Sequence, residues 1–405
     1  MAVVRPSPNP TLVAPVSRLA LALLVASALF AGCSEKASRL TGNERLLRGP
    51  GGLGTTSGVD TLVDRDTAVP PTGTALRGAT LLVGQRGGVY EARSFFRTQT
   101  WTLPDTTDPS LVVDSVLFKV EFDADVIDYL PPPGSLFALS TVGAAWDTTN
   151  VEWPGPAFGT FLASGPDAVG PFTINLGASA FPLVRAWASD PSFPGFILHS
   201  TGADGVRGFQ AGTGRIEIVY HRTGVTNAKA VTTLPTDLTV HNPLPPASGT
   251  ETAIPLGGLF RAEALFRAPV GQPPPGFSIN GAQIVAYIDP TVPAFPTDET
   301  AEIRVYRIRN AWTEDIAAAD SVLGLDTAVL ATISVYRVRS AGDSLVIPIP
   351  PSVAREWSLD PASNQGVLLR VTDSFKIPEI RLLSRESARP PVLRIRTTTP
   401  PPGRF

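Results

Sequence analysis

The chain has 405 residues, 33 basic and 36 acidic side chains, and a formal net charge of −3. This balance argues against a nucleic-acid partner, which would favour a basic face, and an apolar content of 43% excludes wholesale disorder. A single cysteine excludes a disulfide framework. The 41 prolines and 36 glycines favour short strands joined by rigid loops, so the expected fold class is all-β.

The first 33 residues have the pattern of an export signal. Arg5 and Arg18 precede an apolar run over residues 19–30, which is followed by Ala, Gly and then Cys33. A helix that spans the hydrocarbon layer needs about 20 apolar residues, so a permanent transmembrane helix is not expected here.

The segment from Leu29 to Cys33 resembles the bacterial lipobox, in which the cysteine thiol takes a diacylglyceryl group before cleavage leaves it N-terminal. Phe30 stands where that family prefers Leu. The resemblance implies a signal peptide over 1–32 and a lipid anchor on Cys33, and two acyl chains give stable membrane attachment. An ordinary signal peptide with an incidental cysteine is the alternative. In some bacteria an Asp directly after the lipidated cysteine retains a lipoprotein at the inner membrane. Here that position is Ser34, so the outer membrane is favoured.

Both ends of the processed chain are expected to lack a fixed fold. Residues 33–58 are rich in Gly, Ser and Arg and predict a flexible tether, and the proline-rich tail 399–405 predicts disorder.

The chain contains an internal repeat. Residues 87–97 (GGVYEARSFFR) align with 257–267 (GGLFRAEALFR), with five of the 11 positions identical. Four further matches follow in the same order at nearly the same offset, which indicates two copies of one domain. The expected domain ranges are 59–222 and 226–398.

Alternating apolar residues predict strands with one buried face in each copy. The clearest case is 116–122, and each copy closes with a similar strand, near 216–220 and near 393–395. A further alternation at Leu238 and Val240 is expected to be the first strand of the second copy.

The aligned segments exchange an acid and a base. Glu91 and Arg93 in the first copy become Arg261 and Glu263 in the second. Positions two apart share one face of a strand, so each copy is expected to present an acid and a base side by side.

The order of these landmarks resembles the DNRLRE-type domain, a jelly-roll β-sandwich of about 150 residues found in many exported bacterial proteins. The resemblance rests on the Gly turn with Arg-x-Phe-Phe-Arg, the alternating strand, the segment WDTTNVEW over 146–153, and the segment 384–393. The first copy lacks the Ser-Arg-Glu and Arg-Pro-Pro pieces of that last segment. The resemblance implies two tandem jelly-roll-like antiparallel β-sandwiches, and it most directly implies binding to polysaccharide or cell-wall glycan.

No group suited to catalysis stands out in the sequence. His199, His221 and His241 stand apart, without a His-x-His or His-Glu-x-x-His grouping, and there is no Gly-x-Ser-x-Gly elbow. His221 is expected on the surface. The chain is therefore predicted to be non-catalytic and without a cofactor.

Two acidic groups are the candidates for a cation site, because calcium takes several oxygen ligands. Neither group matches a defined calcium loop, so we expect both groups to lie in solvated turns. A structural calcium ion is the alternative. The two groups are Asp60, Asp64 and Asp66, and Asp123, Asp125 and Asp128.

The six tryptophans divide into matched and unmatched residues. Shared packing explains the two matched pairs, Trp146 with Trp312 and Trp187 with Trp357. Trp101 and Trp153 have no counterpart in the second copy and are the candidate ligand-binding residues, because sugar rings stack on flat aromatic side chains. A role in covering loop ends is the alternative.

Three functions remain open at this point. The favoured one is a membrane-anchored lipoprotein, facing the surface or the periplasm, whose β-sandwich modules bind polysaccharide or cell-wall glycan. The alternative is a structural or adhesive envelope protein with protein partners and no glycan ligand. A hydrolase is the least favoured, because no site for one is visible.

Overall fold

A computed structural model describes residues 56–69, 75–76, 80–124, 129–149, 151–167, 171–244, 251–289, 302–314, 320–334, 344–372 and 379–399. The predicted signal peptide, Cys33, most of the predicted tether and nearly all of the predicted tail lie outside these residues, as do Asp125 and Asp128. No helix within the described ranges is long and apolar enough to cross a membrane.

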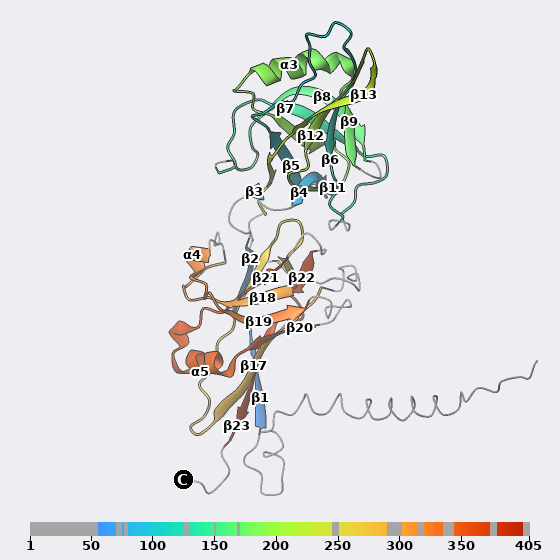
Figure 1. The fold of residues 1–405 in the computed structure, drawn as a ribbon. Coiled ribbons are helices and arrows are strands. Elements are labelled where there is room, and N and C mark those ends of the chain that lie inside the picture. Colours follow the sequence, from blue (N-terminus) through green and yellow to red (C-terminus); the bar gives the residue numbers. More distant parts are fainter. Residues whose placement is uncertain are drawn as a thin grey trace, which may run out of the picture. The chain divides into compact units, whose positions relative to one another are not determined.

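Strands dominate the described chain, which confirms the predicted all-β class (Figure 1). Five sheets are present among the described residues. Two sheets are built from β3 to β14, which we call the first strand group, and three from β1, β2 and β15 to β23, which we call the second strand group. Each sheet draws its strands from one group.

The first group contains β3 (Ala75–Leu76), β4 (Thr80–Arg86), β5 (Tyr90–Arg97), β6 (Val112–Val120), β7 (Leu136–Val142), β8 (Phe158–Pro166), β9 (Phe172–Asn175), β10 (Phe196–Ser200), β11 (Gly205–Gln210), β12 (Arg215–Arg222), β13 (Val225–Thr233) and β14 (Thr236–His241). Its larger sheet has the order β11-β4-β5-β10-β7-β8, with β14 pairing β5 and β3, and its smaller sheet has the order β13-β12-β6-β9.

The second group contains β1 (Thr56–Leu62), β2 (Arg65–Val69), β15 (Ala253–Leu256), β16 (Glu263–Arg267), β17 (Ser278–Tyr287), β18 (Glu302–Arg307), β19 (Val329–Ser334), β20 (Ser344–Ile349), β21 (Val367–Val371), β22 (Ile380–Leu383) and β23 (Val392–Thr398). Its sheets have the orders β1-β23-β17-β20, β19-β18-β21-β16-β2 and β15-β22, and a short helix, α4 (Asp320–Leu323), precedes β19.

The two sheets of the first group pack face to face around one apolar core, which makes this group a β-sandwich. Val116, Phe118 and Val120 of β6 are fully buried in the same cluster as Phe96 of β5 and Leu139 of β7. Burying one such side chain contributes about 1.5–3 kcal/mol, so the alternation in β6 supplies much of what holds the sheets together. The strand predicted near 116–122 is confirmed over Val112–Val120.

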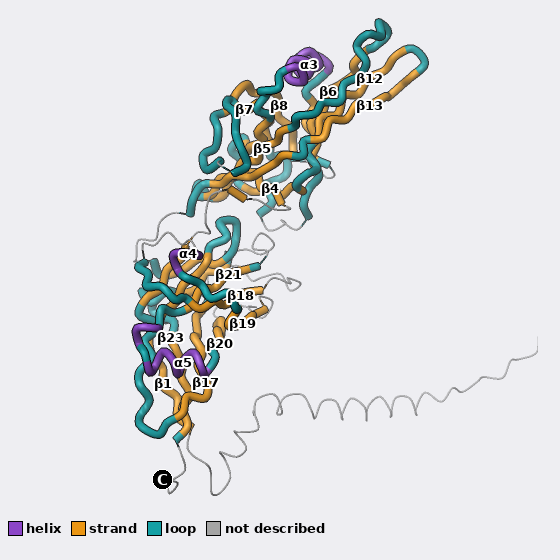
Figure 2. The backbone as a smooth tube through the Cα atoms, turned by 60° about the vertical axis from the view of Figure 1, so that its left-hand side comes forward, coloured by secondary structure: helices purple, strands orange, loops and turns teal. Residues whose placement is uncertain are grey.

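Each strand group carries one helix of nine residues, α3 (Phe181–Ser189) and α5 (Pro351–Leu359), both purple in Figure 2. A proline in the first turn suits each helix start, because its fixed φ matches the helix and its missing N–H is not needed there. Trp187 of α3 stacks on Phe193 at 5.1 Å, and Trp357 of α5 is 1% exposed. The packing role predicted for this matched pair is confirmed.

Strand pairing divides the chain differently from the expected ranges 59–222 and 226–398. β1 and β2 precede the first group in the chain but pair with β23 and β16 of the second group. β13 pairs with β12 of the first group. β14, which contains Leu238 and Val240, pairs with β5 of the same group. The alternation at these two residues marks a strand correctly, but a strand's partner is decided by contacts far away in sequence.

Candidate functional site

Trp101 packs against the inner core of the first group. Its ring lies 6.1 Å from that of Phe193 and 6.4 Å from that of Phe196, measured between ring centroids. It is half-buried and adds to the cluster that includes Phe96 and Phe118. These contacts are those of a side chain that closes one edge of a sandwich core.

Trp153 lies in the segment that joins β7 to β8, and it packs against a different cluster. That cluster contains Phe95 of β5, Ile197 of β10 and Val240 of β14. Phe95 and Phe96 are neighbours on one strand, so their side chains point to opposite faces of the sheet. Trp101 and Trp153 therefore lie on opposite faces of the larger sheet and do not form one surface.

A cationic side chain is held between two aromatic rings beside Trp153. The guanidinium carbon of Arg93 lies 4.5 Å from the centroid of the Trp153 ring and 4.7 Å from that of Phe158. The Phe158 ring in turn lies 4.5 Å from the ring of His199. We call these four residues the Trp153 cluster. One face of Trp153 is covered by Arg93, so a ligand has access only to the rest of the ring.

Glu91 fixes the position of Arg93 within this cluster. Its carboxylate accepts a hydrogen bond from Arg93 Nε at 2.8 Å, and the two side chains form an ion pair at 2.7 Å. The predicted acid and base side by side are thus present in the first copy. In the second copy Arg261 precedes β16 with a φ of 54°, and Glu263 pairs with Arg370 of β21. Arg261 therefore lies in the turn before β16 and not on the strand itself, unlike Glu91, which lies within β5.

Burial lowers the pKa of His199, and the nearby charge of Arg93 acts in the same direction. The Nδ1 atom of His199 lies 3.0 Å from the carbonyl oxygen of Ser200, and Nε2 lies 3.4 Å from Oγ of Ser140. This histidine is therefore neutral at pH 7. It contributes an apolar ring face and a hydrogen-bonding edge to the cluster.

A hollow of about 500 Å³ is lined by residues that precede and follow Trp153 in the chain, from Ala145 to Pro156. These residues all belong to the β7–β8 segment, and they include the apolar side chains of Trp146 and Val151 and the acidic side chains of Asp147 and Glu152. Asp147 is oriented by its own turn, since Oδ1 accepts hydrogen bonds from the backbone N–H and the hydroxyl of Thr149 at 2.7 and 2.6 Å. The hollow thus combines apolar side chains with hydrogen-bond acceptors, which is the composition expected of a small-ligand site.

Trp146 attaches this segment to the sheet, and Trp312 repeats the arrangement in the second group. Trp146 Nε1 donates to the carbonyl oxygen of Pro194 at 2.6 Å, and Trp312 Nε1 donates to that of Gln365 at 2.7 Å. Both side chains are buried, at 6% and 2% exposure. The predicted packing role of this matched pair is confirmed.

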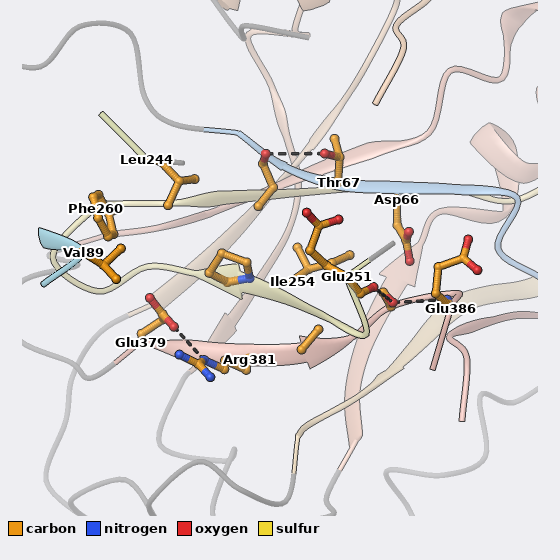
Figure 3. Close-up of a pocket in the computed structure, with 14 residues that line it drawn as sticks. Asp66, Thr67, Val89, Leu244, Glu251, Ile254, Phe260, Glu379, Arg381 and Glu386 are labelled. Atoms are coloured by element: carbon orange, nitrogen blue, oxygen red, sulfur yellow. Dashed lines mark hydrogen bonds and ion pairs between the residues drawn. The ribbon is translucent and has the colours of Figure 1, made fainter. Parts of the chain in front are cut away.

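A second hollow, of about 300 Å³, is lined mostly by carboxylates and apolar groups of the second group, together with Val89 and Leu244 (Figure 3). Asp66 of β2 points into it from one side, and Glu379 pairs with Arg381 at 2.8 Å on the other. Burial raises the pKa of Asp66 to about 6, although the backbone N–H of Arg385 donates to its Oδ2 at 2.6 Å and opposes the shift. Asp66 is therefore a buried acceptor that orders the chain before β23.

Of the acidic residues predicted to lie in solvated turns, the four that the structure describes have individual partners. Asp60 lies within β1 and pairs with Arg394 at 2.9 Å, and Asp123 accepts a hydrogen bond from Thr80 at 2.5 Å. Asp60 and Asp66 lie within strands, so the predicted turn is wrong for both residues, and Asp66 is also buried. In the part of the chain that the structure describes, no group of three His, Cys, Asp or Glu side chains is placed to hold a metal ion.

His221 lies one residue before the end of β12 and keeps nearly half of its side chain exposed, as predicted. Its Nδ1 atom lies 2.8 Å from Oδ1 of Asp114 on the neighbouring strand β6.

Sequence reasoning missed the residues that surround Trp153. Arg93, Phe158 and His199 come from β5, β8 and β10, and only the sheet brings them together. A comparison with models of known protein families finds no match, and a comparison with curated proteins finds none either.

Proposed function

We propose that this chain is an exported bacterial lipoprotein, held in the membrane through lipid on Cys33, whose first strand group binds polysaccharide or cell-wall glycan without catalysis. The observation that supports glycan binding best is the hollow lined by Trp146, Asp147 and Glu152, which precede Trp153 in the chain. Carboxylate oxygens accept hydrogen bonds from sugar hydroxyls, and aromatic rings cover the apolar faces of a sugar.

Arg93 has a positioning role in this proposal. Its guanidinium is fixed by Glu91 and also donates to the carbonyl oxygen of Pro154 at 3.3 Å, next to Trp153 in the chain. It therefore links β5 to the segment that lines the hollow. The cation between two rings contributes on the order of 1 kcal/mol per ring to holding that segment in place.

A glycan array tests the proposal, with the chain from Gly51 onward as the probe. The parent is expected to bind at least one class of polysaccharide or cell-wall glycan. Glu152→Gln and Trp153→Ala are expected to weaken that binding tenfold or more. Trp101→Ala is the matched control, because Trp101 packs on the opposite face of the sheet and its loss leaves the hollow intact.

Two results would count against glycan binding at this hollow. One is a parent chain that binds no glycan on the array. The other is a Trp153→Ala variant that binds as tightly as the parent while Trp101→Ala binds less, since this would move the site to the other face.

A second candidate function, docking to an envelope protein, has one observation in its favour. β8 is the last strand in the order of the larger sheet, and its residues Phe158 to Phe161 are exposed. Phe161 is 60% exposed. Exposed edge strands pair readily with another chain. A photocrosslinking amino acid at position 161 that captures an envelope protein in intact cells would support this function, and capture of none would count against it.

A further inference from the structure

Two sheets, one in each strand group, have the same order of equivalent strands. The closing strands of the two repeats, β12 and β23, are central in the orders β13-β12-β6-β9 and β1-β23-β17-β20. Their neighbours β6 and β17 come from segments that the repeat also aligns, 116–123 and 282–289. β13 and β1 are therefore the equivalent strands on the other side of each closing strand (Figure 1).

β14 and β2 are equivalent in the same way. β14 pairs antiparallel with β5 and β2 pairs antiparallel with β16, and β5 and β16 are the aligned strands of the repeat. Asp237 pairs with Phe96, and Asp66 pairs with Phe266. The sequence Asp-x-x-Val occurs in both strands, ending at Val240 in one and at Val69 in the other.

The same hydrogen bonds hold both strand pairs in place. The backbone N–H of Leu234, between β13 and β14, donates to the carbonyl oxygen just before β12 at 2.8 Å. The backbone N–H of Val63, between β1 and β2, donates to the carbonyl oxygen just before β23 at 3.1 Å. Oδ2 of Asp237 and Oδ2 of Asp66 each accept a backbone N–H from the loop that leads into the closing strand, at 2.5 and 2.6 Å. Burial raises the pKa of both carboxyls.

The two strand pairs differ in how the chain reaches them. In the first group, β12 turns directly into β13, with Arg222 paired to Val225 and Gly224 at a φ of 77°. In the second group the equivalent pair, β1 and β2, lies more than 300 residues before β23 in the chain. Ser57 Oγ lies 2.9 Å from Thr397 Oγ1, and Asp60 pairs with Arg394 at 2.9 Å, so the two strands run antiparallel.

We propose that β1 and β2 form a closing arm, which completes the second copy of the repeat in the position that β13 and β14 occupy in the first. The repeating unit then begins near β3 and ends with β14, and the second copy begins at β15 and is finished by the arm from the same chain. The arm attaches whatever precedes Thr56 directly to the closing strand of the second group. Without the arm, β23 and β16 each lose one neighbour.

Cysteine crosslinking distinguishes this closure from the linear arrangement, in which the arm would close the first copy. The full chain with Cys33→Ser has no other cysteine, so introduced pairs report cleanly. In the first group, Tyr220 pairs with Ala228, which is the equivalent of Thr397 facing Ser57. The variant with Ser57→Cys and Thr397→Cys tests the closing arm, and the variant with Ser57→Cys and Tyr220→Cys tests the linear arrangement.

If the closing arm is correct, we expect an intrachain disulfide in at least nine-tenths of the Ser57→Cys, Thr397→Cys chains after mild oxidation. The Ser57→Cys, Tyr220→Cys variant is expected to form less than one-tenth as much, by mass spectrometry of the linked peptides. Disulfide geometry suits the first pair, because the two side-chain oxygens are already in contact. A link to position 220, a linked dimer from the first variant, or no link in either variant would each overturn the proposal. None of these outcomes depends on a glycan ligand or on lipid.

Discussion

The carboxyl group of Asp66 is buried in the folded chain, and its burial makes the stability of the fold depend on pH. Its pKa is raised to about 6 by burial, and Arg385, Glu314 and Glu386 supply the nearby charges. In the unfolded chain an Asp titrates near 3.9. The folded state binds the proton more tightly, so the stability that this proton contributes is complete below about pH 4 and is lost as the pH rises through about 6.

Replacing Asp66 by Asn is expected to remove this dependence. The amide oxygen of Asn accepts the N–H of Arg385 without placing a charge in the buried site. The free energy of unfolding at pH 7 is expected to rise by about 2–3 kcal/mol, because a pKa shift of one unit corresponds to about 1.4 kcal/mol. Urea unfolding at a series of pH values between 3 and 8 measures the effect.

Asp60→Asn is the matched control for this change. Asp60 is exposed, and the hydrogen bond from Arg394 holds the pKa of its carboxyl below the usual value. An exposed pair contributes little, and its effect has the opposite sign, so Asp60→Asn is expected to leave stability nearly unchanged or slightly lower at pH 7. If Asp66→Asn kept the parent's pH dependence between pH 4 and 6, the role given to Asp66 would be wrong.

At the scale of single elements, the conformation of the β7–β8 segment depends on one glycine, at the point where the segment packs against Phe95 of β5. Gly155 has a φ of 75°, and a Cβ atom there would lie 2.7 Å from Cζ of Phe95. Gly155→Ala is therefore expected to lower the free energy of unfolding by about 2–4 kcal/mol, through both backbone strain and overpacking. It is also expected to weaken glycan binding, because the segment that lines the hollow would shift.

Gly212→Ala separates the two contributions to this effect. Gly212 has a φ of 76°, but a Cβ atom at this position would have no neighbouring atom within 4 Å, so the substitution introduces backbone strain alone. It is expected to cost about 1 kcal/mol and to leave glycan binding unchanged. Equal losses of stability in the two variants would show that Gly155 is not in close contact with Phe95.

Elements with a strong local pattern were predictable from sequence. The alternation in β6 and in the closing strands β12 and β23 marks one buried face, and the structure buries Phe118, Ile218 and Leu393 as that pattern requires. The helices α3 and α5 were not predicted, because nine residues give too short an apolar period and each helix begins beside proline. The partners of β1, β2, β13 and β14 were not predicted either, because local sequence does not encode which of two similar edges a strand joins.

The candidate site shows the same division. Trp101 and Trp153 were predicted to be ligand-binding residues because neither has a counterpart in the second copy. Both are half-buried side chains of the first group. Their assignment to opposite faces depends on how two loops fold back onto the sheet, which no spacing in the sequence reveals. Arg93 stood out as part of an exchanged charge pair, but its position between Trp153 and Phe158 follows from strand order.

At the scale of the whole molecule, we propose a chain that is attached at one end and closed on itself by its first described strands. The closing arm joins the segment after Cys33 to β23, and the β7–β8 segment of the first group lines the hollow proposed for glycan. The proposed attachment to a membrane depends on the thiol of Cys33.

The N-terminus of the protein isolated from bacterial membranes is the most direct test of this central claim. We expect mass spectrometry to find an N-terminal peptide that begins at Cys33 and carries a diacylglyceryl group on its thiol. A Cys33→Ser variant is expected to lack both the lipid and the cleavage before residue 33. An N-terminal residue other than Cys33, or a Cys33 without lipid in the native protein, would contradict the proposed anchor.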